Sequence, residues 1–347
     1  MFYRCPKCKK IWQYPIEKCL DCFKVLEKLP SKKARVIGIS KVNIPTILHP
    51  KVPFFILVLE DENGNKFVQK STKEYKIGEF IDFSPAQDKN AVAIWRVKYD
   101  ILETIEKAVD LVGKLNPIKD SKILILPTLV APKHPYFAVN TNPAFLESLI
   151  NYLIQNGADT KNIKVAAQSF NETPIEVSAQ KSQLLDVCLR YKVSLLDLAK
   201  GSFVKKEVDG LNFEVSKEVF NSDLIINAPI MKLDSKTGIK GASENLLKLL
   251  KKEFYLSKEE EIVENLQKVL SPYLTIASAT AVQKSNSFVS YLGLILASYN
   301  SLNLDRVFAE IVLQKQLPGY LKKLRIDDIP IVGRNIEEVQ YNFERVH

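Results

Sequence analysis

Two pairs of cysteines near the start of the chain restrict what its first residues can fold into. The pairs are Cys5-Pro6-Lys7-Cys8 and Cys19-Leu20-Asp21-Cys22. Each pair directs two sulfurs at one centre, and four thiolates complete the tetrahedral shell of Zn²⁺ without an open position. The pattern therefore predicts a rubredoxin-like zinc ribbon over residues 1–29, with Cys5, Cys8, Cys19 and Cys22 as structural ligands. Iron is the rival metal, because the same four ligands accept it.

The cysteine content and the net charge indicate the cellular compartment of the protein and the kind of partner that it binds. Four of the five cysteines lie in this cluster, which indicates metal ligation rather than disulfides and a reducing cytoplasm. Apolar runs such as residues 291–298 are far shorter than the roughly 20 residues that a membrane-spanning helix needs, so we expect no membrane anchor. The net charge of +9 favours an anionic partner such as a nucleotide, an acyl-coenzyme A or a nucleic acid.

The next segment has the pattern of short β-strands. Asn63-Gly64 between two apolar runs is a strong signal for a tight hairpin. We expect strands at residues 34–42, 54–60, 66–71, 79–83 and 91–98. Five such strands suit a small closed barrel, so residues 30–98 are predicted to form an OB-like β-barrel. Because such barrels bind oligonucleotides through aromatic side chains, a nucleic-acid-binding module of ribbon and barrel is an alternative function.

The rest of the chain changes to alternating strands and helices. Residues 99–116 carry apolar side chains at helical spacing and are predicted to form a connector helix that docks between the two halves. From residue 117 onward, buried strands alternate with helices. This alternation predicts a doubly wound, mostly parallel, Rossmann-like α/β domain over residues 117–347.

Local signals predict where some of these elements begin and turn. Asn142 followed by Pro143 is typical of a helix start, and Asp209-Gly210 predicts a hairpin. Thr173 and Glu176 have the spacing of a capping box, which predicts one helix from there to about residue 190.

The stretch of residues 223–248 is the best candidate for a ligand site. An apolar strand runs into a loop with lysines and glycines, and then into a helix predicted to start near Ser243. Doubly wound sheets bind ligands beyond the carboxyl ends of their strands, and helix N-termini attract anions. We therefore predict that the loop at residues 229–245 binds a small anionic metabolite, for example an acyl thioester or a phosphorylated compound. The predicted ligand-binding residues are Lys232, Thr237, Gly238, Lys240, Gly241, Asn245, Thr141 and Ser169.

The sequence does not decide whether this site is catalytic. If the protein is an enzyme, the candidate acids or bases are Asp234, Glu244 and His134. The chain contains neither the G-x-G-x-x-G fingerprint nor a P-loop, so no nucleotide motif supports a specific reaction. Its three histidines disfavour a histidine-centred triad and a catalytic zinc site with three histidine ligands.

The N-terminal part, residues 1–98, resembles the family designated domain of unknown function 35. The resemblance is carried by the four cysteines, by Pro15 before the second pair and by the Lys76-Ile77-Gly78 turn. Members of that family accompany acyl-coenzyme A enzymes such as thiolases. The resemblance thus implies a third function, that of a scaffold for an acyl-coenzyme A enzyme.

The C-terminal part resembles the family designated domain of unknown function 362. Residues 231–246, M-K-L-D-S-K-T-G-I-K-G-A-S-E-N-L, are similar without a gap to that family's signature L-K-T-H-S-L-T-G-V-T-G-A-L-K-N-L. Residues 125–130, 141–158 and 296–307 resemble further segments of it. The resemblance covers residues 120–340, and it implies a fold related to the nickel-dependent lactate racemase group.

Several polar residues of that family are replaced in this chain. Leu126, Thr128, Asp234 and Glu244 stand where the family has a lysine, an asparagine, a histidine and a second lysine. The cysteine run for a cubane iron–sulfur cluster, which often accompanies the family, is also missing from the sequence. The resemblance therefore implies a divergent branch that keeps the loop but takes another ligand, or binds without catalysis.

Overall fold

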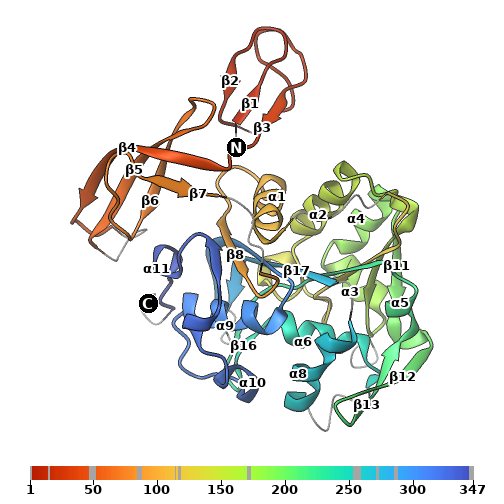
Figure 1. Ribbon diagram of the computed structural model, residues 1–347. Coiled ribbons are helices and arrows are strands. Elements are labelled where there is room, and N and C mark those ends of the chain that lie inside the picture. The colour runs from red at the N-terminus through yellow and green to blue at the C-terminus, as the bar shows by residue number, and fades with distance from the viewer. Residues whose placement is uncertain are drawn as a thin grey trace. The chain divides into compact units, whose positions relative to one another are not determined.

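A computed structural model of the chain divides into two compact units (Figure 1). One unit is Met1–Pro85 with Glu337–Val339, and the other is Ala86–Ile336 with Gln340–His347. The structure describes residues 2–14, 16–46, 52–83, 88–113, 115, 119–169, 173–252, 259–270, 273–284 and 288–343.

The first unit contains two small antiparallel sheets. The sheet of order β2-β1-β3 is formed by β1 (Phe2–Arg4), β2 (Ile11–Trp12) and β3 (Glu27–Leu29). The sheet of order β6-β5-β4-β7 is formed by β4 (Lys33–Val42), β5 (Phe54–Asp61), β6 (Lys66–Ser71) and β7 (Phe80–Asp82). Alternate residues of β5, Phe55, Leu57 and Leu59, form its buried core with Ala34 and Val36 of β4, as period-2 burial requires. The predicted hairpin joins β5 to β6, with Gly64 at φ 78°.

The fifth strand predicted for the OB-like barrel does not belong to this four-stranded sheet. The strand at that position, β8 (Val92–Arg96), pairs with strands of the second unit instead. The physical reason is visible in its burial, because Val92, Ala93 and Ile94 are buried consecutively rather than alternately. Consecutive burial belongs to a strand that is covered on both faces.

The second unit is built on an eight-stranded sheet of order β11-β10-β9-β14-β17-β18-β8-β19. Its other strands are β9 (Ile123–Pro127), β10 (Ile163–Ala167), β11 (Ser194–Asp197), β14 (Leu224–Ala228), β17 (Tyr273–Gln283), β18 (Val289–Ser298) and β19 (Ile331–Gly333). The first five strands in this order are parallel, whereas β18 is antiparallel to both neighbours. The predicted doubly wound, mostly parallel sheet is therefore confirmed. Strand order reverses between β9 and β14, where such sheets bind ligands.

Helices cover this sheet (Figure 1). The helices of this unit are α1 (Ile101–Val112), α2 (Pro143–Gln155), α3 (Ile175–Lys181), α4 (Leu184–Tyr191), α5 (Lys217–Phe220), α6 (Ala242–Leu246), α8 (Glu259–Val269), α9 (Ser301–Ile311) and α10 (Gly319–Lys322), whereas α11 (Ile336–Val339) belongs mostly to the first unit. One large apolar cluster joins α1 to α4 with β9, β10 and β14. In the described parts of the chain, none of these helices has both the length and the apolar character that crossing a bilayer requires.

The sequence predicts a connector helix between the two halves, but helix α1 does not have this role. It belongs to the second unit and packs on β8, β18 and α2. Its apolar face, with Ile105, Ala108, Val109 and Val112, is buried in the main cluster. An apolar helix face is stable only when it packs against another apolar surface, and for α1 the sheet of the second unit supplies that surface.

In the second unit, the predicted helix start at Asn142 and the predicted Asp209-Gly210 hairpin are confirmed, whereas the capping box predicted at Thr173 is not. Asn142 Oδ1 accepts a hydrogen bond from Ala144 N at 2.8 Å and caps α2. Asp209-Gly210 forms the turn between β12 (Phe203–Val208) and β13 (Leu211–Ser216). The predicted capping box does not form, because α3 starts after Pro174 without a side-chain cap. The single helix predicted there is two helices, since Gln183 has φ 62° and separates α3 from α4.

Candidate functional site

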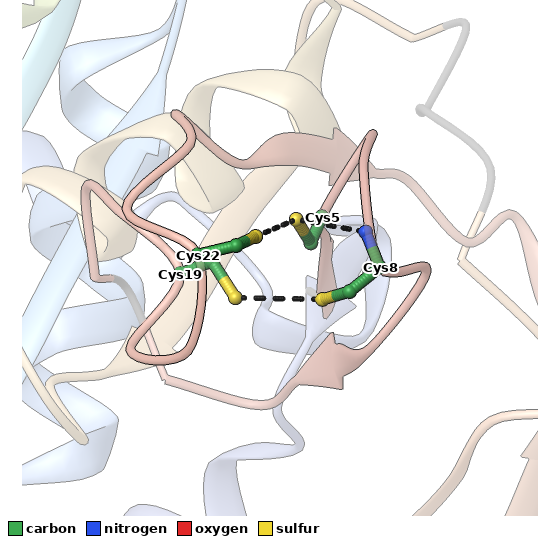
Figure 2. A group of neighbouring side chains, drawn as sticks. All are labelled: Cys5, Cys8, Cys19 and Cys22. Atoms are coloured by element: carbon green, nitrogen blue, oxygen red, sulfur yellow. Dashed lines mark hydrogen bonds between the residues drawn. The ribbon is translucent and has the colours of Figure 1, made fainter.

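The four cysteines of the first unit form one cluster (Figure 2). All four Sγ atoms lie within 4.8 Å of one another, with Cys5 Sγ 3.2 Å from Cys22 Sγ and Cys8 Sγ 3.6 Å from Cys19 Sγ. The two pairs make the same turn: Cys5 N donates to Lys10 O, and Cys19 N donates to Lys24 O. Cys8 N also donates to Cys5 Sγ at 3.4 Å, as metal-bound thiolates favour. The cluster could hold a metal ion, and the predicted ligand set fits.

A buried amide crosslinks the second unit at the switch between β9 and β14. Asn245 Nδ2 donates to Leu126 O at 2.9 Å and to Asn227 Oδ1 at 2.8 Å, while its Oδ1 accepts from Thr128 Oγ1 at 3.0 Å. The amide thereby ties α6 to the ends of both central strands. Asn245 was predicted to contact a ligand, yet its polar atoms already have protein partners.

Thr141 has the same kind of role. Its Oγ1 accepts from Thr128 N and donates to Ala228 O, both at 2.8 Å, and it is buried. It therefore holds the loop after β9 against the end of β14. The residue lies at the predicted edge of the sheet, but its hydroxyl is occupied.

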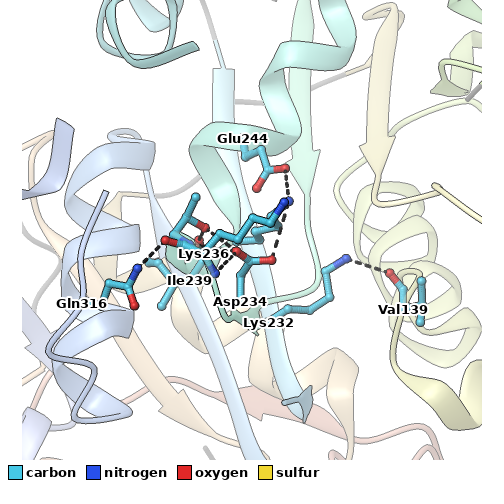
Figure 3. Close-up of polar contacts among 9 residues, drawn as sticks. Val139, Lys232, Asp234, Lys236, Ile239, Glu244 and Gln316 are labelled. Carbon is cyan, nitrogen blue, oxygen red and sulfur yellow. Dashed lines mark hydrogen bonds and ion pairs between the residues drawn. The ribbon is translucent and has the colours of Figure 1, made fainter. Parts of the chain in front are cut away.

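The loop after β14 contains a small hairpin of β15 (Lys232–Asp234) and β16 (Gly238–Lys240). Asp234 Oδ1 accepts from Lys236 N, Thr237 N and Thr237 Oγ1 at 2.9 to 3.0 Å (Figure 3). Partial burial raises the pKa of Asp234, but these backbone hydrogen bonds and the nearby charge of Lys240 outweigh it and hold that pKa below its ordinary value. A carboxylate held in this way closes the hairpin turn and is a poor proton donor.

Both glycines of the predicted ligand loop are required by packing. Gly238 has φ 85°, and a Cβ there would lie 1.9 Å from Gln316 O. A Cβ on Gly241 would lie 2.4 Å from Met231 Cε and 2.6 Å from Asp305 Oδ1. Close approach of the protein's own atoms therefore accounts for both.

The start of α6 does not offer an anion site, contrary to the prediction. Ala242 N and Ser243 N donate to the two carboxylate oxygens of Asp305 at 2.7 and 2.8 Å. Asp305 is buried in α9, and burial raises its pKa to about 6 although these hydrogen bonds lower it. The protein's own carboxylate thus takes the position that the prediction gave to a ligand. The helix is also one short turn, followed by the 3₁₀ turn η4 (Leu247–Leu249).

Lys232 lies in the hairpin with Glu244 beside it (Figure 3), Lys240 pairs with Glu244, and the charges of Lys232 and Glu244 act on a third lysine, Lys248. Lys240 Nζ lies 3.8 Å from Asp234 Oδ2 and 3.4 Å from Glu244 Oε1, so its charge is balanced. Lys232 Nζ donates to Val139 O at 3.2 Å. In the part of the chain that the structure describes, no carboxylate lies within ion-pair distance of Lys232. Burial lowers the pKa of Lys232, and the charge of Glu244 partly opposes this.

Lys248 is the third lysine of the group. It lies in η4, half-buried, with Nζ 2.6 Å from Asn245 Oδ1 and 3.4 Å from Pro127 O at the end of β9. Both acceptors are neutral, and no carboxylate within the described ranges pairs with it. Burial, reinforced by the positive charge of Lys232, lowers the pKa of Lys248 to about 7, although Glu244 opposes it.

The family described as Domain of unknown function (DUF362) matches residues 123–310, which is more than half of the chain. The chain belongs to this family. The DUF362 region spans the strands β9, β10, β14 and β17 and the lysine group beside them. The resemblance stated for the C-terminal part is thus confirmed.

Solved structures with low similarity were also found, and no curated protein matches. The structure titled "Ltp2-ChsH2(DUF35) aldolase" is 19% identical, covers 23% of this chain and 68% of its own, and has a TM-score of 0.20. The lactate racemase apoprotein from Thermoanaerobacterium thermosaccharolyticum is 12% identical with a TM-score of 0.38, and covers 66% of this chain. The match spans 59% of the racemase chain, which is less than two thirds of its length.

The remaining predicted residues of the DUF362 region are held in other local structures. His134 is exposed, and its Nδ1 accepts from Tyr136 N at 3.2 Å, which caps the turn η1 (Pro135–Phe137). Ser169 donates through both N and Oγ to Asp197 at the end of β11. Thr237 Oγ1 lies 3.0 Å from Ile239 O, within the hairpin. These side chains are placed by local structure, whereas Lys232, Lys240 and Glu244 come together as a charged group.

Lys248 and Asp305 were missed by the sequence analysis. Each is a charged residue inside an apolar helical pattern: Lys248 stands between Leu247 and Leu249, and Asp305 follows Leu304. A charge on the buried side of such a pattern is rare unless it is paired or functional. That signal alone could have drawn attention to both.

Proposed function

We propose that the α/β unit binds a small anionic metabolite above the carboxyl ends of β9 and β14, with Lys232 as its cationic contact and the amine of Lys248 as a second contact. The compound would be an acyl thioester, a phosphorylated compound or another small molecule with a carboxylate or phosphate group. The location agrees with the general rule that doubly wound sheets bind ligands where strand order reverses.

One observation carries the proposal: the charge of Lys232 acts on Lys248, and neither lysine has a carboxylate within ion-pair distance in the described ranges. Two partly buried cations near each other are costly unless an anion joins them. Lys240 provides the contrast, because Asp234 and Glu244 already balance its charge. The proposed site therefore uses one predicted lysine and one that the sequence analysis missed.

The experiment is a thermal unfolding series with a panel of anions on the full chain. Orthophosphate, pyrophosphate, acetyl-coenzyme A and pyruvate are each added over a concentration range. A bound anion at 100 times its Kd stabilises the folded protein by about 2.7 kcal/mol, which raises the melting temperature by several degrees. Lys232→Ala should abolish this rise, and Lys240→Ala should reduce it less.

The matched control is Lys164→Ala, which removes an exposed lysine that is ion-paired with Glu218. It should respond to the anion as the unchanged chain does. If no anion of the panel stabilises the protein, or if Lys232→Ala responds like the Lys164 control, the proposed site is wrong.

For the first unit, we propose that the cysteine cluster binds one structural Zn²⁺ and that the protein works in the reducing cytoplasm. The support is the donor set of four thiolates with no other ligand type, which suits zinc in a closed tetrahedral site. Elemental analysis of protein purified without added metal tests this directly. Iron in place of zinc would correct the metal but keep the site.

A further inference from the structure

We infer that Lys248 forms an imine with the carbonyl carbon of a 2-oxo acid whose carboxylate is held by Lys232. This inference rests on the proposed function, since it uses the same anion site and names its substrate class. A 2-oxo acid has a carbonyl directly beside a carboxylate, which matches an amine beside a cation.

The position of the Lys248 amine is set by neutral partners. Asn245 Oδ1 lies 2.6 Å from Nζ, and Pro127 O lies 3.4 Å from it. Asn245 is itself fixed by Leu126 and Asn227 of the two central strands. The amine is therefore directed by a rigid group at the switch point rather than by a mobile surface loop.

The surroundings also favour the neutral form of the amine, which is the nucleophilic form. Lysine nucleophiles are activated by burial and by a second cation nearby. Lys248 has both, because it is half-buried and the charge of Lys232 acts on it. The pKa of Lys248 is lowered to about 7, so a large part of the amine is unprotonated near neutral pH.

Lys232 is less suited to the same step. Its Nζ donates to Val139 O; burial lowers the pKa of Lys232, while the charges of Glu244 and Asp234 act against that shift. These two carboxylates favour its charged form, which is the form that binds a carboxylate. The two lysines therefore have different tasks.

The chemical step balances without an oxidant or a metal. The lone pair of the Lys248 nitrogen forms a bond to the carbonyl carbon, and the carbonyl oxygen takes a proton. The carbinolamine then loses this oxygen as water while the nitrogen gives up its protons, which leaves a C=N bond. Glu244 is the carboxylate whose charge acts on Lys248, so it is the candidate carrier of these protons.

The test is reductive trapping on the whole chain, purified without chelator. The protein is incubated with pyruvate and sodium cyanoborohydride, which reduces an imine to a stable secondary amine. Intact-mass analysis counts the carboxyethyl groups, and peptide mapping locates them. We expect one group per chain, on Lys248. Labelling should increase about tenfold per pH unit below the pKa and level off above about pH 7.

Two variants sharpen the result. Lys248→Met should lose the label, whereas Lys164→Met should keep it. Mapping in the unchanged chain identifies the labelled lysine even if Lys248→Met does not fold. Lactate, which has the carboxylate but no carbonyl, should compete with labelling without forming an adduct.

The outcomes separate this inference from the proposed function. If pyruvate stabilises the protein but no adduct forms on Lys248, the imine is refuted while the anion site stands. If pyruvate neither stabilises the protein nor forms the adduct, while another anion stabilises it through Lys232, the substrate class is refuted. If no anion of the panel binds and no adduct forms, both ideas fail. An adduct spread evenly over exposed lysines also overturns the inference.

Discussion

Replacing Asn245 by alanine should destabilise the α/β unit more than any single hydrogen bond would suggest. The side chain is buried and joins Leu126 O, Asn227 Oδ1 and the Thr128 hydroxyl. All three groups lose this partner at once in the Asn245→Ala variant, and so does the Lys248 amine, which keeps Pro127 O as a partner.

The magnitude follows from the cost of leaving buried polar groups unpaired. Each costs roughly 1–3 kcal/mol, so three give about 3–9 kcal/mol. A water molecule in the vacated space can satisfy one of them, which leaves two and brings the expected loss to about 2–6 kcal/mol. This is a large part of the 5–15 kcal/mol that typically stabilises a folded protein.

The assay is urea unfolding followed by tryptophan fluorescence. The chain has two tryptophans, Trp12 in the first unit and Trp95 in β8 of the second. A Trp12→Phe background therefore makes Trp95 report on the α/β unit alone. The midpoint should fall at an unchanged slope, as expected when only stability changes.

The matched control is Asn142→Ala, which removes the cap of α2. Loss of such a cap costs about 1 kcal/mol. If Asn245→Ala costs no more than this control, the idea that Asn245 ties the two central strands together is refuted.

Two further predictions concern pH and metal. The pKa of Lys248 is lowered to about 7 in the folded state from an ordinary 10.5, so the unfolded chain binds more protons between these two pH values. The free energy of unfolding should therefore rise with pH across that window. Urea titrations at several pH values measure this rise, and the Lys248→Met variant should lose it. A chelator, or the double substitution Cys5→Ser and Cys22→Ser, should unfold the cysteine turns and leave the α/β unit folded. If elemental analysis still finds one metal ion per chain in the double variant, the four-cysteine site is contradicted.

The sequence by itself determined the parts of this protein that depend on near neighbours. The cysteine pairs predicted their cluster because each pair lies within one tight turn, and two such turns can enclose one ion. Asn142 and the Asp209-Gly210 turn were read correctly because a cap and a two-residue turn act on adjacent backbone groups. The mostly parallel sheet followed from the alternation of strands and helices, which permits few other arrangements.

The tertiary structure decided what depends on partners far along the chain. Which sheet takes β8 is set by β18, about two hundred residues later. The anion that fills the start of α6 is Asp305, from α9, and local sequence around Gly241 carries no trace of it. Lys248 became a candidate only when folding buried its amine within the influence of the charge of Lys232 and beyond ion-pair distance of the described carboxylates. A lysine acquires an unusual pKa from such surroundings and not from its neighbours in sequence.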